Sequence, residues 1–304
     1  MASRKWIQAA AAVAQNAYFK GFLTGSLFKG WSKSLCVPGL NCYSCPGALG
    51  SCPIGALQSL AINRSVSLSF YVYGFILMAG VATGRFVCGF LCPFGWIQEL
   101  LHKIPLKKFR ESRFLRVLGK LKYIVLAVLV VGIPTVLTQT GSVGFPAFCQ
   151  WLCPAGTLEA GIPLAIANER ISGAVGWLFV WKVAVLALVV LLSMKIFRPF
   201  CRFLCPLGAL YALFNRVSIV HIRTDPVRCN RCDRCVGICP MHATGTDSPE
   251  CIRCGACIKQ CRAKAKRWSC GLGRESLPVE VIESCPTNRS CPNSPTTPTK
   301  SSPS

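Results

Sequence analysis

The segment CNRCDRCVGICPMHATGTDSPECIRCGACIKQC, residues 229–261, carries two runs of cysteine with the same spacing. The first run reads C-x2-C-x2-C-x3-C-P, and the second repeats the spacing without the proline. Two-residue gaps let a tight loop bring three thiolates onto one face of a 4Fe-4S cubane, while the fourth thiolate points to the other cluster. The runs therefore predict two 4Fe-4S clusters with crossed ligands, one held by Cys229, Cys232, Cys235 and Cys261 and the other by Cys251, Cys254, Cys257 and Cys239.

Zinc is the alternative metal for this segment, because C-x2-C pairs also build zinc ribbons. Zinc ribbons use two well-separated pairs of cysteines, whereas each run here has four cysteines in overlapping spacing. Small residues such as Gly255 and Ala256 also suit the close approach of backbone amides to cluster sulfur. The segment is therefore interpreted as a two-cluster ferredoxin-type module of the α+β class.

The rest of the chain has the composition of a membrane protein. Of its 304 residues, 52% are hydrophobic and 15% are charged, against roughly 25% charged residues in soluble domains. The formal net charge of +23 counts every thiol as neutral, so iron-bound thiolates would offset part of it. Aromatic and basic residues are not interleaved on a soluble face, so nucleic acid is not expected as a partner.

Apolar segments predict an α-helical multi-pass membrane protein of about four spans. Residues 65–84 contain no charge over 20 residues, which matches the roughly 20 residues needed to cross a hydrocarbon core. Residues 123–141 and 171–194 are two more candidates, the second interrupted only by Lys182. Residues 6–28 are weaker because they include several polar side chains, and they suit a span, an in-plane helix or a signal peptide.

Basic loops predict the orientation, because Lys and Arg in short loops favour the cytoplasmic side of the inner membrane. The loop 102–122 holds eight Lys and Arg residues, whereas Arg170 is the single basic residue in 139–170. Residues after 220 should then be cytoplasmic and residues 30–64 external. The predicted domains are a membrane domain over 1–220, a cytoplasmic ferredoxin-type domain over 221–268 and a disordered tail, rich in Pro, Ser and Thr, over 269–304.

The element C-P-x-G occurs four times in the predicted membrane domain, beginning at Cys52, Cys92, Cys153 and Cys205. Three copies have a second cysteine four residues earlier, at Cys88, Cys149 and Cys201. In the predicted topology, Cys88, Cys92, Cys201 and Cys205 share the cytoplasmic ends of spans and form a complete ligand set for a third 4Fe-4S cluster. Arg85 and Arg198, each three residues before a pair, would compensate the charge of a buried anionic cluster.

Six further cysteines should lie on the outer side: Cys36, Cys42, Cys45, Cys52, Cys149 and Cys153. They exceed the needs of one cluster, so two of them are spare, disulfide-bonded or redox-active. The structural alternative for the C-P elements is that they only end helices, with buried cysteine packing as a small apolar residue. A hydrocarbon core about 30 Å thick would separate outer from inner cysteines, so a quinone pocket or clusters recessed into the bundle must bridge them.

Lys182 lies inside a predicted span and should face the bundle interior, because a charge is costly in lipid. There it would contact a quinone or an anionic cluster, or pack against a neighbouring helix. A quinone is therefore a candidate ligand beside the clusters, and iron, bound by the cysteines, is the metal expected.

The motifs GRFVCGFLCPFG (84–95) and RPFCRFLCPLGAL (198–210), followed by both ferredoxin-type runs, resemble those of the NapH-like membrane polyferredoxins. The resemblance covers about residues 1–265. It implies oxidation of a quinol, or delivery of cytoplasmic reducing equivalents, with electrons passed to a partner at the membrane. The chain departs from the family in its cysteine-rich loop CVPGLNCYSCPGALGSCPIGAL (36–57) and in the extra pair Cys149 and Cys153, so it need not share the nitrate-reductase partner.

Three functions are consistent with these residues. The first is a redox conduit that passes electrons between a quinol or a cytoplasmic donor and a partner redox enzyme. The second is an accessory reductase that acts on a metal or a disulfide of a partner during its maturation, and the extra outer cysteines favour it. The third is a redox sensor, which is weighed below the other two. No catalytic residue is predicted, and an electron-transfer subunit is expected rather than a stand-alone enzyme.

Overall fold

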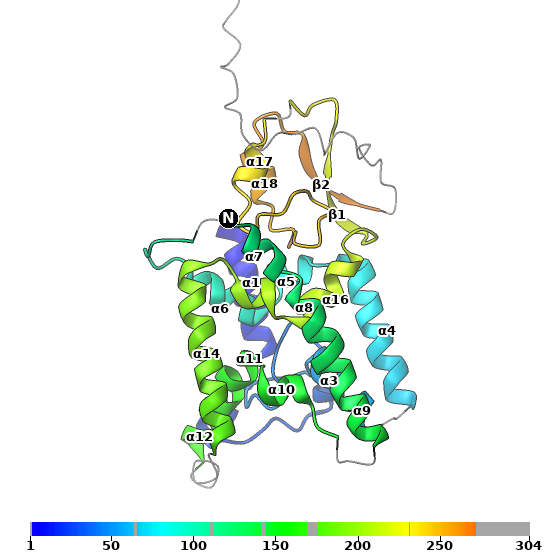
Figure 1. The fold of residues 1–304 in the computed structure, drawn as a ribbon, viewed down its shortest axis with the longest axis vertical. Coiled ribbons are helices and arrows are strands. Elements are labelled where there is room, and N and C mark those ends of the chain that lie inside the picture. Colours follow the sequence, from blue (N-terminus) through cyan, green and yellow to red (C-terminus); the bar gives the residue numbers. More distant parts are fainter. Residues whose placement is uncertain are drawn as a thin grey trace, which may run out of the picture.

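The computed structural model describes residues 2–63, 66–109, 112–140, 144–168, 176–230 and 232–271. The chain is mostly helical, and β1 (Val220–Thr224) and β2 (Lys266–Cys270) form a two-stranded sheet. The helices stand side by side in an elongated bundle, and the sheet lies beyond one end of it, near the N-terminus (Figure 1). We call this the sheet end of the bundle and the opposite end the far end. The predicted start of the tail, residue 269, was wrong, because Ser269 and Cys270 belong to β2 and pair with β1. The rest of the predicted tail, from 272 onward, lies outside the described residues.

Two helices in the described part of the chain are long and apolar enough to cross a membrane. One is α14 (Trp177–Lys195), with a mean hydropathy of 2.3. The other runs over Arg113–Gln139 with a mean hydropathy of 2.1. It consists of α7 (Arg113–Leu118), α8 (Leu121–Val125), the π-helical η2 (Leu126–Gly132) and α9 (Ile133–Gln139). These two helices coincide with the expected spans 171–194 and 123–141. Residues 171–175 of the first span and residue 141 of the second lie outside the described residues.

A third expected span, residues 65–84, is occupied by α4 (Val66–Thr83). Its described apolar stretch, Phe70–Thr83, is shorter than a full crossing. The fourth, residues 6–28, is divided between α1 (Ala2–Gln15) and α2 (Lys20–Thr24), and a left-handed glycine, Gly25, follows α2. A single helix is therefore not formed across this segment.

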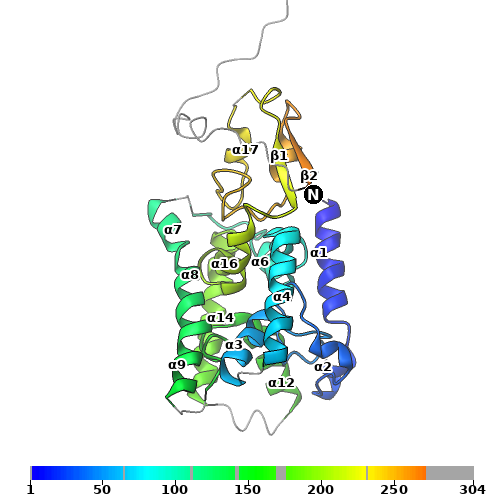
Figure 2. The same ribbon diagram turned by 90° about the vertical axis from the view of Figure 1, so that its right-hand side faces the viewer.

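The polar residues of α1 serve packing rather than lipid contact. Gln8 Nε2 donates to Gly89 O at 2.9 Å, and Gln15 Nε2 donates to Leu91 O at 2.8 Å. These bonds hold α1 against the short segment that carries Cys88 and Cys92, beside the bundle (Figure 2).

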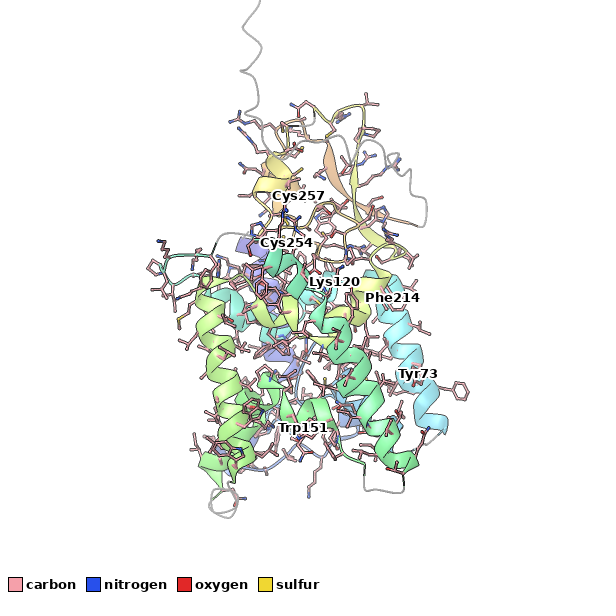
Figure 3. All side chains as sticks on the ribbon, in the orientation of Figure 1. Tyr73, Lys120, Trp151, Phe214, Cys254 and Cys257 are labelled. Carbon is pink, nitrogen blue, oxygen red and sulfur yellow. The ribbon has the colours of Figure 1, made fainter. Side chains whose placement is uncertain are left out.

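Large apolar side chains cover the outside of the bundle. On α14, Leu188 and Leu191 are 57% and 61% exposed, and on α4, Phe70 and Tyr73 are 76% and 53% exposed. Figure 3 shows Tyr73 pointing away from α4. Soluble proteins seldom leave such extensive apolar surface uncovered, so this surface suits contact with lipid.

Short helices fill the space between the long ones. They are η1 (Trp31–Ser34), α3 (Pro53–Asn63), α5 (Phe86–Phe90), α6 (Pro93–Leu101), α10 (Ala147–Trp151), α11 (Pro154–Gly156), the π-helical η3 (Thr157–Gly161), α12 (Ile162–Ala167), α15 (Pro199–Phe203) and α16 (Pro206–Phe214). Among them, α5, α6 and α16 lie toward the sheet end, and α3, α10, α11 and α12 lie toward the far end (Figure 1). Four of these helices, α3, α6, α11 and α16, begin at the proline of a C-P-x-G element.

The residues after α16 hold the sheet and two short helices, α17 (Arg234–Gly237) and α18 (Ala256–Gln260). The strands are antiparallel, with Val220 opposite Cys270. This C-terminal part packs directly on the bundle, since Ile219 N donates to Val81 O at 2.8 Å. Met241 and Ile252 also belong to the same buried apolar cluster as Cys88 and Cys92. The two parts therefore share one core.

Candidate iron–sulfur sites

Four cysteines gather inside the bundle near the sheet end, and we call them the inner set: Cys88, Cys92, Cys201 and Cys205. Each is between 4% and 7% exposed, and every pair among them interacts electrostatically. Cys88 and Cys201 lie on α5 and α15, and Cys92 and Cys205 are the N-caps of α6 and α16. The pairs therefore lie beyond the ends of α4 and α14, on short helices that the apolar pattern did not resolve.

The C-P-x-G element begins a helix with a cysteine cap. The thiols of Cys92, Cys153 and Cys205 accept hydrogen bonds from the glycine amide three residues later, at 3.4, 3.4 and 3.3 Å. Proline fits the first helical position because its missing N–H would have no partner there. A thiolate at this place also faces the positive end of the helix dipole. The element thus starts a helix and leaves the cysteine sulfur at the N-terminal end of that helix, in the buried interior.

Two buried arginines exchange hydrogen bonds across the inner set. Arg85 precedes Cys88, and its Nη2 donates to the carbonyl of Cys201 at 3.1 Å. Arg198 precedes Cys201, and its Nη1 donates to the carbonyl of Cys88. Both guanidinium groups are fully buried and interact electrostatically with inner thiols. Each arginine therefore secures the opposite cysteine pair and places positive charge beside the sulfur atoms.

The glycines of the inner C-P-x-G elements leave room for these arginines. A β-carbon at Gly95 would lie 2.9 Å from Arg198 Nη1, and one at Gly208 would lie 3.4 Å from Arg85 Nη2. The guanidinium group of Arg198 also pairs with Glu99 at 2.9 Å. The arginine packs so closely on the start of the helix that a side chain at the glycine of C-P-x-G would collide with it or crowd it.

A polar residue lies six positions after each C-P-x-G cysteine, and the cysteine spacing did not predict its role. Gln98 Nε2 donates to Cys201 Sγ at 3.2 Å, and its Oε1 accepts from Phe200 N at 3.1 Å. Gln58 repeats both bonds at the other site, donating to Cys149 Sγ at 3.1 Å and accepting from Phe148 N at 3.0 Å. Aligning the four copies over seven positions, C-P-x-G-x-x-x, would have revealed these residues.

The other two copies have Glu159 and Tyr211 at this position, and both hold the cysteine-rich loop. Glu159 Oε2 accepts from Cys42 N at 2.8 Å, and the Tyr211 hydroxyl donates to Pro38 O at 3.0 Å. The loop 36–52 is thereby drawn into the bundle rather than left on its surface.

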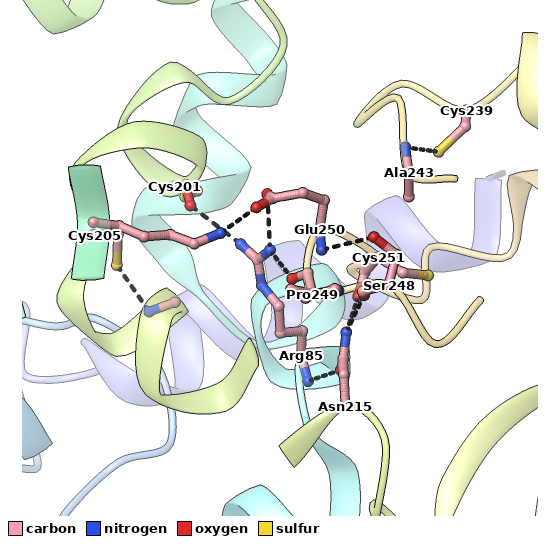
Figure 4. Close-up of polar contacts among 12 residues, drawn as sticks. Arg85, Cys201, Cys205, Asn215, Cys239, Ala243, Ser248, Pro249, Glu250 and Cys251 are labelled. Carbon is pink, nitrogen blue, oxygen red and sulfur yellow. Dashed lines mark hydrogen bonds and ion pairs between the residues drawn. The ribbon is translucent and has the colours of Figure 1, made fainter. Parts of the chain in front are cut away.

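The C-terminal part contacts the inner set through Arg85 and Asn215 (Figure 4). Asn215 Oδ1 accepts from the backbone amide of Arg85 at 3.0 Å, and its Nδ2 donates to Cys251 O and Ser248 O, both at 2.9 Å. Arg85 Nη1 donates to Pro249 O at 2.6 Å. A hydrogen-bonded path therefore joins the carbonyl of Cys201 to that of Cys251.

Glu250 neutralises the buried cations at this contact. Its carboxylate pairs with Arg85 at 3.3 Å and with Lys122, and both cations are fully buried. Burial opposes ionisation of Glu250, but Arg85 and Lys122 outweigh it and hold the pKa of the carboxyl below its usual value of 4.5. The carboxyl is therefore charged at neutral pH.

One set of C-terminal cysteines faces a common space. Cys239, Cys251, Cys254 and Cys257, the four thiols that the crossed pairing assigns to one cluster, line a cavity of about 30 Å³. Cys254 packs against the apolar cluster that contains the inner set, and Figure 3 shows it where the C-terminal part meets the bundle. Burial raises the pKa of Cys251 to about 12, so this thiol stays protonated at neutral pH until a metal binds.

The other C-terminal set comprises Cys229, Cys232, Cys235 and Cys261. Cys229 and Cys235 interact electrostatically, and α17, which carries Cys235, packs on α18. Cys261 Sγ accepts from Ala265 N at 3.3 Å, as Cys239 Sγ accepts from Ala243 N at 3.4 Å. The last cysteine of each run therefore has the same local geometry.

Most of the predicted outer cysteines surround one large cavity. Cys36, Cys42, Cys52, Cys149 and Cys153 line a space of about 1020 Å³, and Lys182 lines it too. Cys45 is buried, and its thiol donates to Asn16 Oδ1 at 3.6 Å. Every cysteine in the described part of the chain is a free thiol. Lys182 thus faces the interior, beside the cysteines.

The cysteine groups are too widely spaced for one ion. Among the residues that the structure describes, no three His, Cys, Asp or Glu side chains are close enough together to hold a single metal ion. Zinc needs four donors at about 2.0–2.3 Å from one centre. The thiolates of a cubane bind four different iron atoms.

A family model described as a 4Fe-4S binding domain matches residues 65–110, 124–162 and 176–223. These residues include the three C-x3-C-P pairs, at Cys88, Cys149 and Cys201, and end before the C-terminal runs. The description of the model thus applies to the bundle itself.

Named relatives point to the same family. Uncharacterized protein MJ0750 of Methanocaldococcus jannaschii is 30% identical over 234 residues, which cover 74% of this chain and 89% of that protein. The ferredoxin-type protein NapH of Escherichia coli is 27% identical over 192 residues, 62% of this chain and 59% of NapH. The methylamine utilization ferredoxin-type protein MauN of Paracoccus denitrificans is 29% identical over 169 residues, 55% of this chain and 50% of MauN. No solved structure matches the chain.

The relatives and the two long apolar helices together indicate a membrane protein. The cysteine sets and the 4Fe-4S family model indicate iron–sulfur clusters. The chain therefore belongs to the NapH-like family of 4Fe-4S ferredoxin-type proteins.

Proposed function

We propose that the chain is a membrane-bound electron carrier that passes electrons between a quinol or a cytoplasmic donor and a partner redox enzyme. The observation that carries the proposal is the contact between the C-terminal cysteines and the inner set. Arg85 donates to Cys201 O at 3.1 Å, and Asn215 links Arg85 to Cys251 O. Two cysteine sets with cluster spacing therefore meet across one hydrogen-bonded network.

Three sets of four cysteines would hold the clusters of this carrier. They are Cys229, Cys232, Cys235 and Cys261; Cys239, Cys251, Cys254 and Cys257; and the inner set Cys88, Cys92, Cys201 and Cys205. The overlapping C-x2-C-x2-C-x3-C spacing of both runs and the shared cavity of the second set support a cluster over zinc. Bound clusters supply one-electron carriers whose potential depends on burial and on hydrogen bonds to sulfur. Arg85, Arg198 and Gln98 would provide the charge and hydrogen bonds at the inner set.

The C-terminal part of this carrier, residues 221–268, would lie in the cytoplasm, packed on the membrane part of residues 1–220. The eight Lys and Arg residues in 102–122 support this side, since α7 and the start of the long helix lie at the sheet end. Lys122 has an internal role, because it pairs with Glu250. Lys108 donates to three backbone carbonyls. The exposed basic side chains suit contact with the anionic inner leaflet, and they are Lys103, Lys107, Arg113, Arg116 and Lys120.

The proposed electron donor is a quinol or a cytoplasmic reductant, and the proposed acceptor is a partner enzyme that can be reduced. A quinol gives up two electrons and two protons when it is oxidised, and one-electron carriers accept the electrons singly. The partner enzyme is reduced by the same number of electrons. The two O–H bonds of the quinol break, and its two protons leave to water at the quinol site while the one-electron carriers take the electrons.

Iron and acid-labile sulfide in anaerobically purified protein test the proposal. With clusters in the bundle as well as in the C-terminal part, the content should be at least about twelve iron atoms per chain. A content of about eight, the sum of two clusters, would remove the inner set from the function.

Single variants separate the inner set from the C-terminal sets. Cys88→Ser and Cys201→Ser should each lose one cluster while the two ferredoxin-type EPR signals persist. Loss of both ferredoxin-type signals in these variants would show that the sites are not independent. Cys45→Ser is a matched control, because Cys45 is equally buried but lies outside the inner set.

An accessory reductase is the second candidate, and Cys36 favours it. This cysteine lines the large cavity and its backbone amide donates to the Tyr71 hydroxyl at 2.8 Å, so a thiol stands beside space for a substrate. A maturation reductase should lose activity toward its partner on Cys36→Ser while its clusters stay intact. A conduit should retain electron flow in the same variant.

A further inference from the structure

The outer cysteines repeat the arrangement of the inner set. The thiols of Cys42, Cys52, Cys149 and Cys153 interact electrostatically in every pair, as the four inner thiols do. A β-carbon at Gly156 would lie 3.6 Å from Cys42 Sγ and 3.7 Å from Cys153 Sγ, which places these two sulfur atoms around one point. We call these four cysteines the outer set.

The helix starts of the two sets correspond one to one. At the inner set, α6 and α16 begin after Cys92 and Cys205, and at the outer set, α3 and α11 begin after Cys52 and Cys153. Gln58 bonds to Cys149 Sγ as Gln98 bonds to Cys201 Sγ. The two sites are therefore built from the same repeated unit.

The repeat explains why the loop supplies one outer ligand. Three C-P-x-G copies have a cysteine four residues earlier, but Ala48 occupies that position before Cys52. Cys42 supplies the ligand that Ala48 cannot. Its backbone amide donates a hydrogen bond to Glu159 Oε2, and its thiol interacts electrostatically with Cys153. Cys45 bonds to Asn16 and Cys36 lies beside Tyr71, so these two are the extra thiols.

Charge at the outer set also suits an anionic cluster. Lys182 interacts electrostatically with Cys42 and Cys149, and Lys33 interacts with Cys42 and Cys45. The negative charge of Glu159 opposes this effect, because it repels a thiolate at Cys42. The adjoining cavity of about 1020 Å³ gives the site room.

One peptide unit connects the outer set to the inner set. The backbone amide of Leu40 donates to the thiol of Cys92, and the next amide, of Asn41, donates to the thiol of Cys52. Adjacent amides are joined by a single residue, so the two sulfur atoms lie within about 12 Å of each other. Tyr211 is fully buried and interacts electrostatically with Cys88 and Cys92 of the inner set and with Cys36 and Cys52 of the cysteine-rich loop.

We propose that Cys42, Cys52, Cys149 and Cys153 hold a further 4Fe-4S cluster, and that the Leu40–Asn41 peptide sets it beside the inner set. The inference deepens the proposed function and rests on it only in that the inner set also holds a cluster. Electron exchange between the sites oxidises one as it reduces the other by one electron, with no bond broken and no proton moved. The sulfur atoms of Cys92 and Cys52 then lie within about 12 Å of each other, instead of being separated by the hydrocarbon thickness of about 30 Å that the topology alone suggested.

Iron content of single variants tests the outer site. Cys149→Ser and Cys153→Ser, purified anaerobically, should each contain about four iron atoms fewer than the parent chain. Cys45→Ser and Cys36→Ser, the matched controls, should keep all of them. The ferredoxin-type EPR signals show whether each variant is folded. Full iron in Cys149→Ser, or the same loss in Cys45→Ser, would overturn the assignment.

The proposed function and this inference fail separately. Loss of iron in Cys149→Ser with none in Cys201→Ser would refute the inner site and keep the outer one, and the reverse would refute the outer site alone. The link is tested by the microwave power that half-saturates the inner EPR signal. It should fall in Cys149→Ser, because a nearby fast-relaxing spin is removed, and an unchanged value would refute the proximity of the two sites.

Discussion

Replacement of Glu250 by glutamine should loosen the C-terminal part from the bundle. Glu250 pairs with Arg85 and Lys122, whose side chains are fully buried, and its own side chain is 26% exposed. Glu250→Gln keeps the shape of the side chain and leaves two buried cations without their anion. Removing one partner of a buried ion pair costs about 3–5 kcal/mol. The partial exposure of Glu250 favours the lower end, so we expect a loss of about 3 kcal/mol, or roughly 150-fold in the docking equilibrium.

Hydrogen exchange at the amide of Ile219 measures this loss. The amide donates to Val81 O on α4, so it exchanges when the C-terminal part separates from the bundle. Under conditions where exchange follows the opening equilibrium, Glu250→Gln should accelerate exchange of this amide by about 150-fold.

Asp225→Asn is the matched control for the removal of one carboxylate. Asp225 pairs with Arg228 at 3.5 Å, and the Arg228 side chain is 68% exposed, so the pair contributes at most about 1 kcal/mol. Asparagine also keeps the oxygen that accepts from Val227 N at 3.0 Å. Exchange in this control should rise by less than about fivefold. If Glu250→Gln behaves like Asp225→Asn while its iron content is intact, the ion pairs do not hold the docking contact.

Three further predictions use the same preparations. Gln98→Leu removes a hydrogen bond to Cys201 Sγ and should make the reduction potential of the inner signal more negative in an EPR titration, whereas Gln58→Leu should leave it unchanged. Gly89→Ala would push a β-carbon into the carbonyl oxygen of Ile252 and should accelerate Ile219 exchange, while Gly74→Ala, which meets no atom within 4 Å, should not. Anaerobic removal of iron should make residues 220–271 sensitive to protease and leave α14 resistant. The reason is that α17 and α18 have only 4 and 5 residues and lack a large apolar core without the clusters. Equal resistance before and after removal of iron would contradict this prediction.

Cysteine spacing predicted much of the candidate site. The C-x3-C-P pairs named all four cysteines that the structure gathers as the inner set, because a fixed spacing on a short helix leaves little freedom in where a sulfur atom points. The outer set was less accessible to sequence. Ala48 interrupts its repeat, and Cys42 reaches the site through a loop whose path depends on Glu159 and Tyr211. Such long-range bonds leave no local pattern.

Hydropathy predicted the long helices but not the short ones. A largely apolar run of nine residues such as α16 looks the same in sequence whether it ends a span or folds back into the bundle. The polar residues of 6–28 lowered its apolar score, yet Gln8 and Gln15 are the residues that hold α1 against the cysteine pairs. Polar residues that break a pattern were in this case evidence of a buried contact.

The short helices that start at cysteine also constrain how the protein is made. With 9 residues in α6 and in α16, these segments are too short to enter a bilayer alone, since about 20 residues are needed. They can therefore settle only after the long helices are in place, and their thiols are then almost fully covered. We therefore expect the proposed inner cluster to be loaded during membrane insertion. Reconstitution of finished apoprotein with iron and sulfide should refill the C-terminal sites and leave the inner set empty, and a completely refilled protein would show that the bundle opens to admit its metal.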